Sequence, residues 1–139
     1  MIHPWRWTTV EAPDRLPMIA VGDWNSGRFD DPTNAPRDVY SAGGFVDPLG
    51  ATAGTTTTAP GATVEKRIDT WLNSSNGTWS RKPIGHPTWV NGTYIDYIMT
   101  TSMRVSEWET VTNMDANGNL IGQIPSDHNM IRATVWLPE

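Results

Sequence analysis

The chain has 139 residues, of which 37% are hydrophobic, and this length is sufficient for one domain with a hydrophobic core. Its net charge is −5, and no basic cluster is longer than the Lys66-Arg67 and Arg81-Lys82 pairs. If nucleic acid is the substrate, its binding by this chain alone should therefore be weak, or a divalent cation must supply the positive charge. Cysteine is absent, which excludes disulfides and thiolate metal sites.

No apolar run approaches 18 residues, so we expect no membrane span. The first residues lack the basic and then apolar pattern of a secretory signal, and both a cytoplasmic and a secreted location stay open. We expect one domain over residues 1–139. The three N-x-S/T sequons, at Asn73, Asn76 and Asn91, are attributed to chance in a chain rich in Asn, Thr and Gly.

The first half of the chain predicts one strand and one helix. The apolar run 17–22 ends at Gly22, where a sharp turn would present Asp23 and Asn25 at the end of a strand. Residues 34–42 predict a helix, with Asn34 as a possible cap, Pro in the first turn and glycine at its end. The Ala, Thr, Gly and Pro composition of 50–63 predicts a loop or an extended edge segment.

The second half predicts strands separated by turns. Alternating apolar and β-branched residues predict strands at 67–72, 94–99, 103–112 and 130–137. Turn residues predict breaks at 73–77 and at a hairpin tip, 115–119. The tip has some residues of a calcium loop, but the spacing is wrong and Ser126 stands where the bidentate Glu should be. We therefore predict an α/β fold: one mostly antiparallel sheet of five or six strands with one or two helices.

Eight Trp residues stand out in so short a chain. Packing within a β-rich protein is the favoured interpretation, and a platform that stacks bases or sugars is the alternative.

Three short motifs carry acidic residues next to the predicted strands. They are Gly-Asp-Trp-Asn at 22–25, Ile-Asp-Tyr-Ile at 95–98 and Ser-Asp-His at 126–128. Phosphodiester hydrolysis needs an activated water and groups that stabilise charge on the phosphoryl oxygens. Imidazole suits this chemistry because its pKa lies near neutrality. An acid within the apolar strand 94–99 also calls for a partner.

In order and character these motifs resemble the endonuclease/exonuclease/phosphatase superfamily, which shares the fold of pancreatic deoxyribonuclease. The resemblance implies that Asp23 orients or activates the attacking water and that Asn25 contacts phosphate, with Trp replacing the usual Phe between them. It implies that Asp127 lies near the metal and the water, and that His128 contacts phosphate or transfers a proton. It further implies that Asp96 hydrogen-bonds His128 and fixes its tautomer.

The resemblance matches only the C-terminal half of the family domain. The whole domain is a four-layered α/β-sandwich, so this chain would form half of that sandwich. It implies a Mg²⁺ or Mn²⁺ cofactor with Asp127 as a ligand, although neither Glu11 nor Asp14 matches the family's main metal-binding Glu. A half domain would expose the inner face of its sheet. We therefore expect a homo-oligomer, or pairing with a separate N-terminal half.

The function predicted is metal-dependent hydrolysis of a phosphodiester, including nucleic acid as a substrate. The resemblance leaves the substrate open among nucleic acids, inositol phosphates and sphingomyelin. A non-catalytic binding or assembly module is the alternative, and a Trp-rich carbohydrate-binding domain is a weaker one. His3, His86 and Asp69 are assigned no function.

Overall fold

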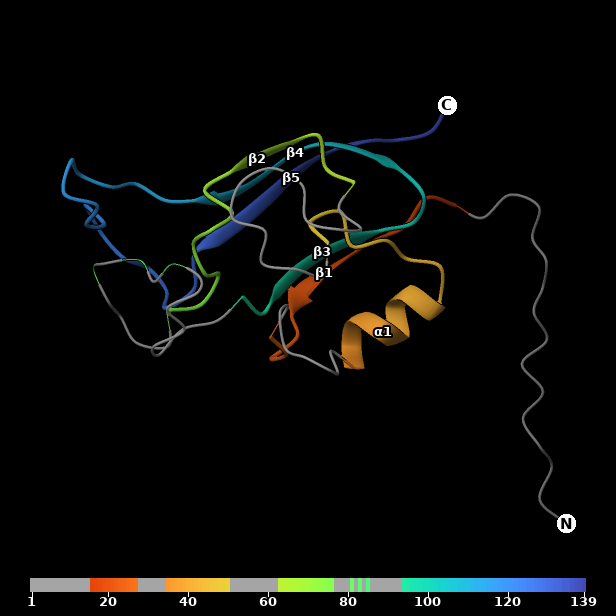
Figure 1. Ribbon diagram of the computed structural model, residues 1–139, viewed down its shortest axis with the longest axis horizontal. Helices are drawn as coiled ribbons and strands as arrows, with labels where there is room; N and C mark the ends of the chain where they lie inside the picture. The colour runs from red at the N-terminus through yellow and green to blue at the C-terminus, as the bar shows by residue number, and fades with distance from the viewer. Residues whose placement is uncertain are drawn as a thin grey trace, which may run out of the picture.

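The computed structural model describes residues 16–27, 35–50, 63–76, 81, 83, 85 and 94–139. Figure 1 shows the five strands and the helix of this part of the chain. They are β1 (Ile19–Asp23), α1 (Ala35–Ala42), β2 (Lys66–Ile68), β3 (Asp96–Thr100), β4 (Arg104–Val111) and β5 (Met130–Trp136). The predicted strands and helix are therefore present, whereas most of the predicted loop 50–63 lies outside the described residues. Within the described part, no helix has the length and apolarity needed to cross a membrane.

The strands form two sheets, and the prediction of a single sheet of five or six strands is wrong. β1 pairs antiparallel with β3 in one sheet. In the other, β4 lies between β2, which is parallel to it, and β5, which is antiparallel. β3 and β5 are in contact and run beside each other, but they share no ladder of hydrogen bonds.

The segment 73–76 explains why β3 and β5 do not pair where both strands begin. The backbone N–H groups of Ile95 and Asp96 donate to the Ser74 hydroxyl oxygen, at 3.0 and 3.1 Å. The N–H of Asn129 donates to the Ser74 carbonyl oxygen at 2.7 Å. Since these donors are already bonded to Ser74, they cannot join the two strands to each other.

The predicted strand 67–72 is shorter than expected, because β2 ends at Ile68. The next residue, Asp69, has a φ of 51°, in the left-handed region where a strand cannot continue. Its carbonyl accepts the N–H of Leu72 at 3.0 Å, which closes a turn.

Helix α1 ends in a hydrogen-bonded cap that its sequence accounts for. The N–H of Phe45 donates to the Tyr40 carbonyl and that of Gly44 to the Ser41 carbonyl, both at 3.0 Å. Gly44 has a φ of 89°, so the pattern is a Schellman motif with glycine at the left-handed position. The rings of Tyr40 and Phe45 pack edge to face at 5.3 Å and add the apolar contact typical of this cap.

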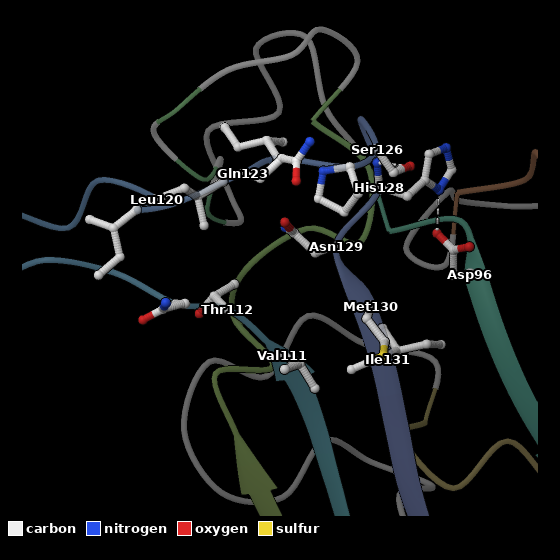
Figure 2. A pocket seen from close by; sticks show the side chains of 14 residues that line it. Asp96, Val111, Thr112, Leu120, Gln123, Ser126, His128, Asn129, Met130 and Ile131 are labelled. Carbon is white, nitrogen blue, oxygen red and sulfur yellow. Dashed lines mark hydrogen bonds and ion pairs between the residues drawn. The ribbon is translucent and has the colours of Figure 1, made fainter.

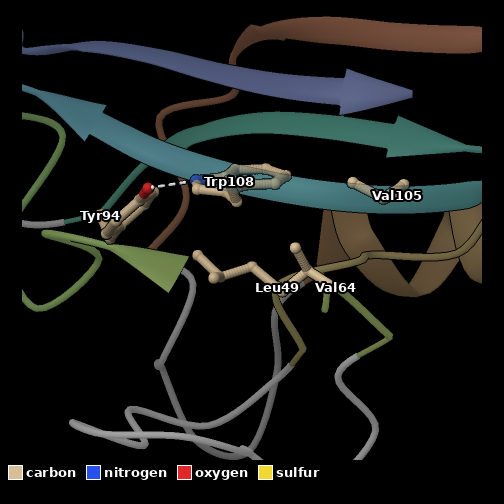
Figure 3. Close-up of a cluster of buried hydrophobic side chains, with 5 residues drawn as sticks. All are labelled: Leu49, Val64, Tyr94, Val105 and Trp108. Atoms are coloured by element: carbon tan, nitrogen blue, oxygen red, sulfur yellow. Dashed lines mark hydrogen bonds between the residues drawn. The ribbon is translucent and has the colours of Figure 1, made fainter. Parts of the chain in front are cut away.

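The hydrophobic core lies against one face of the β2-β4-β5 sheet (Figure 3). Trp108 is 0% exposed, and its indole N–H donates to the Tyr94 hydroxyl oxygen at 2.8 Å. The Tyr94 hydroxyl is also 3.2 Å from the Thr110 hydroxyl. The polar atoms of these three side chains are therefore paired with one another within the core. Leu49, Val64 and Val105 complete the cluster.

The opposite face of this sheet carries charged side chains that pair across the strands. Lys66 contacts Glu107 at 3.0 Å, and Arg132 contacts both Glu107 and Glu109. Since Lys66 and Arg132 are engaged by carboxylates, this face offers little positive charge to a nucleic-acid backbone.

Candidate functional site

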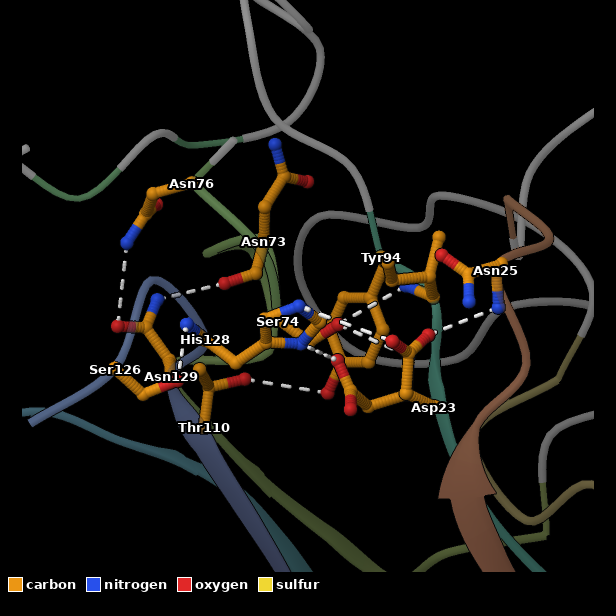
Figure 4. A network of polar contacts seen from close by, with 12 residues as sticks. Asp23, Asn25, Asn73, Ser74, Asn76, Tyr94, Thr110, Ser126, His128 and Asn129 are labelled. Atoms are coloured by element: carbon orange, nitrogen blue, oxygen red, sulfur yellow. Dashed lines mark hydrogen bonds and ion pairs between the residues drawn. The ribbon is translucent and has the colours of Figure 1, made fainter. Parts of the chain in front are cut away.

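Three of the predicted site residues meet at one edge of the two sheets. The antiparallel register of β1 and β3 places Asp23 opposite Asp96, and His128 lies just before β5. The Nδ1 atom of His128 is 2.9 Å from Asp96 Oδ2, the hydrogen bond drawn in Figure 2. Its Nε2 atom is 3.9 Å from Asp23 Oδ2 (Figure 4). The imidazole therefore lies between two carboxylates from different strands.

Short local turns orient these side chains. The Ser126 hydroxyl oxygen accepts the backbone N–H of His128 at 3.0 Å, which fixes the turn that leads into β5. Asp23 Oδ1 accepts the backbone N–H of Asn25 at 2.9 Å. Asn25 has a φ of 48°, a left-handed conformation that asparagine tolerates better than most residues. The Gly-Asp-Trp-Asn motif is thus a tight turn that holds the Asp23 carboxylate at the edge.

Trp24 anchors this turn to the body of the protein. Its ring is stacked between those of Tyr40 and Tyr97, with centroids 4.4 Å away on each side. Its backbone N–H donates to the Ile95 carbonyl at 3.0 Å. Because both faces of the indole are covered, Trp24 packs rather than offering a surface on which a base could stack.

Segment 73–76 supports the site, and sequence analysis missed this role. Asn73, Ser74, Ser75 and Asn76 are all buried, with exposures between 0 and 6%. The side chain of Asn129 donates to the Asn73 carbonyl at 2.8 Å and its Oδ1 is 3.3 Å from Asn76 Nδ2 (Figure 4). The signal in the sequence is a run of four polar residues, 73–76, directly after the apolar Leu72. The same run is typical of an ordinary turn, so it did not indicate a supporting role.

The burial of this segment also bears on two of the sequons. The side chains of Asn73 and Asn76 lie inside the folded protein, at 0 and 3% exposure. A glycan cannot be accommodated there, which agrees with attributing these two sequons to chance. Asn91 lies outside the described residues.

Electrostatics favour the charged form of the imidazole. Burial of the His128 ring lowers its pKa, but the hydrogen bond that the ring donates to Asp96 and the charges of Asp96, Asp23 and Asp127 outweigh that effect. The net result is a pKa raised above the ordinary value of 6.5. At neutral pH the ring is therefore more protonated than a free histidine, and it can donate hydrogen bonds from both nitrogens.

Replacing Asp96 by Asn should lower the pKa of His128, because the partner loses its charge while the burial remains. Since the folded pKa is raised, the pair stabilises the fold fully below pH 6.5, and this contribution is lost as the pH rises through the raised pKa. The stability difference between wild type and Asp96→Asn should therefore be largest in mild acid. NMR titration of the His128 ring and urea unfolding at several pH values measure the two effects. A His128 pKa that is unchanged in the variant would contradict this account.

The side chain of Asp127, next to His128, makes no hydrogen bond or ion pair with any described residue, whereas its backbone carbonyl accepts the N–H of Asn76 at 2.9 Å. Its charge reaches the imidazole, and its side chain is partly exposed. Within the described residues, no group of three or more His, Asp or Glu side chains is arranged to hold a metal ion. The described residues by themselves therefore do not fit a complete Mg²⁺ site, which needs several oxygen ligands.

Asp115 belongs to the hairpin tip 115–119, for which a calcium site was rejected, and its carboxylate is used within that tip. Its Oδ1 atom accepts the backbone N–H groups of Asn117 and Asn119 at 2.8 and 2.9 Å, and these bonds lower its pKa. His3 and His86 lie outside the described residues.

Comparison with known proteins supports the fold expected from the three motifs. Neither a protein-family model nor a curated protein sequence matches the chain. A solved structure, an endonuclease/exonuclease/phosphatase family protein from Bacteroides thetaiotaomicron, is similar with a TM-score of 0.50 and 16% sequence identity. The similarity covers 88% of this chain but 38% of the other, so this chain spans well under half the length of that protein. The resemblance is thus confirmed at the level of the fold, and the coverage is consistent with the C-terminal half of such a domain.

Proposed function

We propose that this chain provides the histidine and aspartate part of a phosphodiester-hydrolysing site. The observation that carries the proposal is the position of His128, held by Asp96 on one nitrogen and facing Asp23 on the other. The similarity of the fold to an endonuclease/exonuclease/phosphatase family protein supports a hydrolase.

Each residue has a role that follows from its contacts. Asp96 accepts the Nδ1 proton of His128, which leaves the Nε2 proton for a phosphoryl oxygen. The 3.9 Å separation between Nε2 and Asp23 is longer than a hydrogen bond, so Nε2 is not committed to that carboxylate. The imidazolium stabilises the negative charge that builds up on phosphorus-bound oxygens in the transition state.

Asp23 and Asn25 complete the proposed set. The Asp23 carboxylate is 36% exposed at the same edge, where it can accept a proton from the attacking water. Asn25 is exposed beside it, and its amide can donate to a phosphate oxygen. We assign no catalytic step to Asp127, whose negative charge acts on the His128 imidazole.

A divalent ion, expected from the resemblance, would need ligands that the described residues do not supply. Asp127 is the carboxylate best placed to be one of them, because no described residue binds it. An ion bound there would neutralise charge on the phosphate and counter the acidic net charge of the chain.

We propose further that the site is completed by a second body of protein, either another copy of this chain or a separate N-terminal half. In support, β1 pairs only with β3 among the described strands, and its Ile19 and Val21 side chains are 46 and 67% exposed. Exposed strand edges and apolar side chains of this kind usually lie at interfaces.

Hydrolysis of bis(p-nitrophenyl) phosphate and of DNA, with and without Mg²⁺, tests the proposal. The specific activity should rise with protein concentration if a second copy completes the site. Absence of hydrolysis at every protein and Mg²⁺ concentration would count against catalysis by this chain or its oligomer.

A non-catalytic binding module is the second candidate, and it is favoured by the lack of a three-residue metal cluster among the described residues. In that case, inorganic phosphate would perturb the His128 ring in NMR spectra while no phosphodiester was hydrolysed.

A further inference from the structure

A hollow of about 590 Å³ opens directly beside the proposed site. Figure 2 shows Ser126 and His128 close together at one side of the hollow, with the Asp96 carboxylate joined to the imidazole by a hydrogen bond. The other walls come from the end of β4, from the hairpin 112–124 and from the start of β5. The hollow is therefore adjacent to the imidazole at which a phosphate is proposed to bind.

The lining of the hollow is mainly apolar. Six aliphatic side chains contribute to it: Val111, Leu120, Ile121, Ile124, Met130 and Ile131. Among the described residues that line it there is no Lys or Arg, and the two charged ones, Asp96 and His128, already pair with each other. Such a wall cannot bind a further phosphate group, because the negative charge of that phosphate would have no cationic partner in the hollow.

Two features indicate that the hollow receives a ligand group. Ile121 and Met130 leave 45 and 62% of their surface in water at its mouth, so an apolar occupant would gain from covering them. Gln123 is exposed on the rim, and its amide has no hydrogen-bond partner among the described residues. An apolar cavity of this size with a few polar groups is typical of small-molecule sites.

We propose that the hollow binds an uncharged, planar organic substituent of the phosphodiester, an aryl group or a nucleobase, next to the phosphate held by His128. The aliphatic walls cover the faces of the ring, and the Gln123 amide reaches its polar edge. This inference rests on the proposed function, because it places the phosphate at His128. It disfavours substrates that carry several phosphates on the same ring.

NMR of the complete chain tests the inference, using ¹³C-labelled isoleucine methyl groups and histidine rings. Inorganic phosphate and diphenyl phosphate should both shift the His128 ring signals. Diphenyl phosphate alone should also shift the methyl signals of Ile121 and Ile124, and it should bind about tenfold more tightly than inorganic phosphate.

The variant Ile121→Asn should remove most of that tenfold preference and leave the affinity for inorganic phosphate unchanged. Leu137→Asn is the control, because Leu137 is also an exposed apolar residue, at 66%, but lies outside the hollow. If diphenyl phosphate shifts His128 but neither methyl group, and binds no more tightly than inorganic phosphate, the subsite is wrong and the proposed function stands. If neither ligand shifts His128, the proposed function fails and the subsite fails with it.

Discussion

Replacing His128 by Ala is expected to lower kcat/KM for phosphodiester hydrolysis by about 10²- to 10⁴-fold, the usual contribution of a positioned acid or base. The imidazole is the group that both carboxylates of the site face, at 2.9 and 3.9 Å. Its loss removes the only cationic side chain at this edge among the described residues, and it leaves Asp23 and Asp96 to repel the phosphodiester monoanion. Steady-state kinetics with bis(p-nitrophenyl) phosphate measure the effect.

Two further variants separate catalysis from general damage to the fold. Thr134→Ala alters an exposed residue of the same strand, β5, and should leave the kinetics unchanged. Asp96→Asn should reduce activity less than His128→Ala, because the ring remains and Asn still offers an oxygen to Nδ1. Activity of His128→Ala equal to that of wild type would remove the mechanism proposed for this site.

The strands were predictable because each depends on a local pattern, whereas the meeting of the three motifs was expected from the family resemblance. Alternation in 130–137 and in 103–112 corresponds closely to β5 and β4, since a strand with one buried face needs a period of two. The acid of the Ile-Asp-Tyr-Ile motif was expected to have a partner because it interrupts an apolar strand. In the structure that partner is His128, 32 residues further along the chain.

The division into two sheets and the role of segment 73–76 could not be predicted, since both depend on contacts between distant residues. Nothing local distinguishes Ser74 as an acceptor for two backbone N–H groups of the strand that begins 22 residues later. Asn129 likewise looks like an ordinary residue after the Ser-Asp-His motif, yet its amide joins the start of β5 to segment 73–76. These polar contacts set the spacing between β3 and β5, and thus the distance between Asp96 and His128.

Replacing Trp108 by Ala is expected to destabilise the fold by about 3–5 kcal/mol, the usual range for removing a buried large aromatic side chain. Trp108 is 0% exposed and packs among Leu49, Val64 and Val105. The change leaves a cavity, and it also removes the indole N–H that donates to the Tyr94 hydroxyl oxygen. Small domains are typically stable by only about 5–15 kcal/mol, so much of the stability would be lost. Urea unfolding, followed by circular dichroism, measures the difference.

Trp136→Ala is the matched control, because this tryptophan is 56% exposed at the end of β5. Its contact with the Arg104 guanidinium, 5.2 Å from the ring centroid, is solvent-exposed and should be worth no more than about 1 kcal/mol. Tyr94→Phe should fall between the two, at about 1–3 kcal/mol, because it leaves the Trp108 indole N–H buried without its acceptor. Equal losses for Trp108→Ala and Trp136→Ala would mean that the core does not centre on Trp108. The expected order of the three stability losses follows from the burial and the hydrogen bonds of these side chains alone. The comparison therefore tests the packing against this sheet independently of any activity.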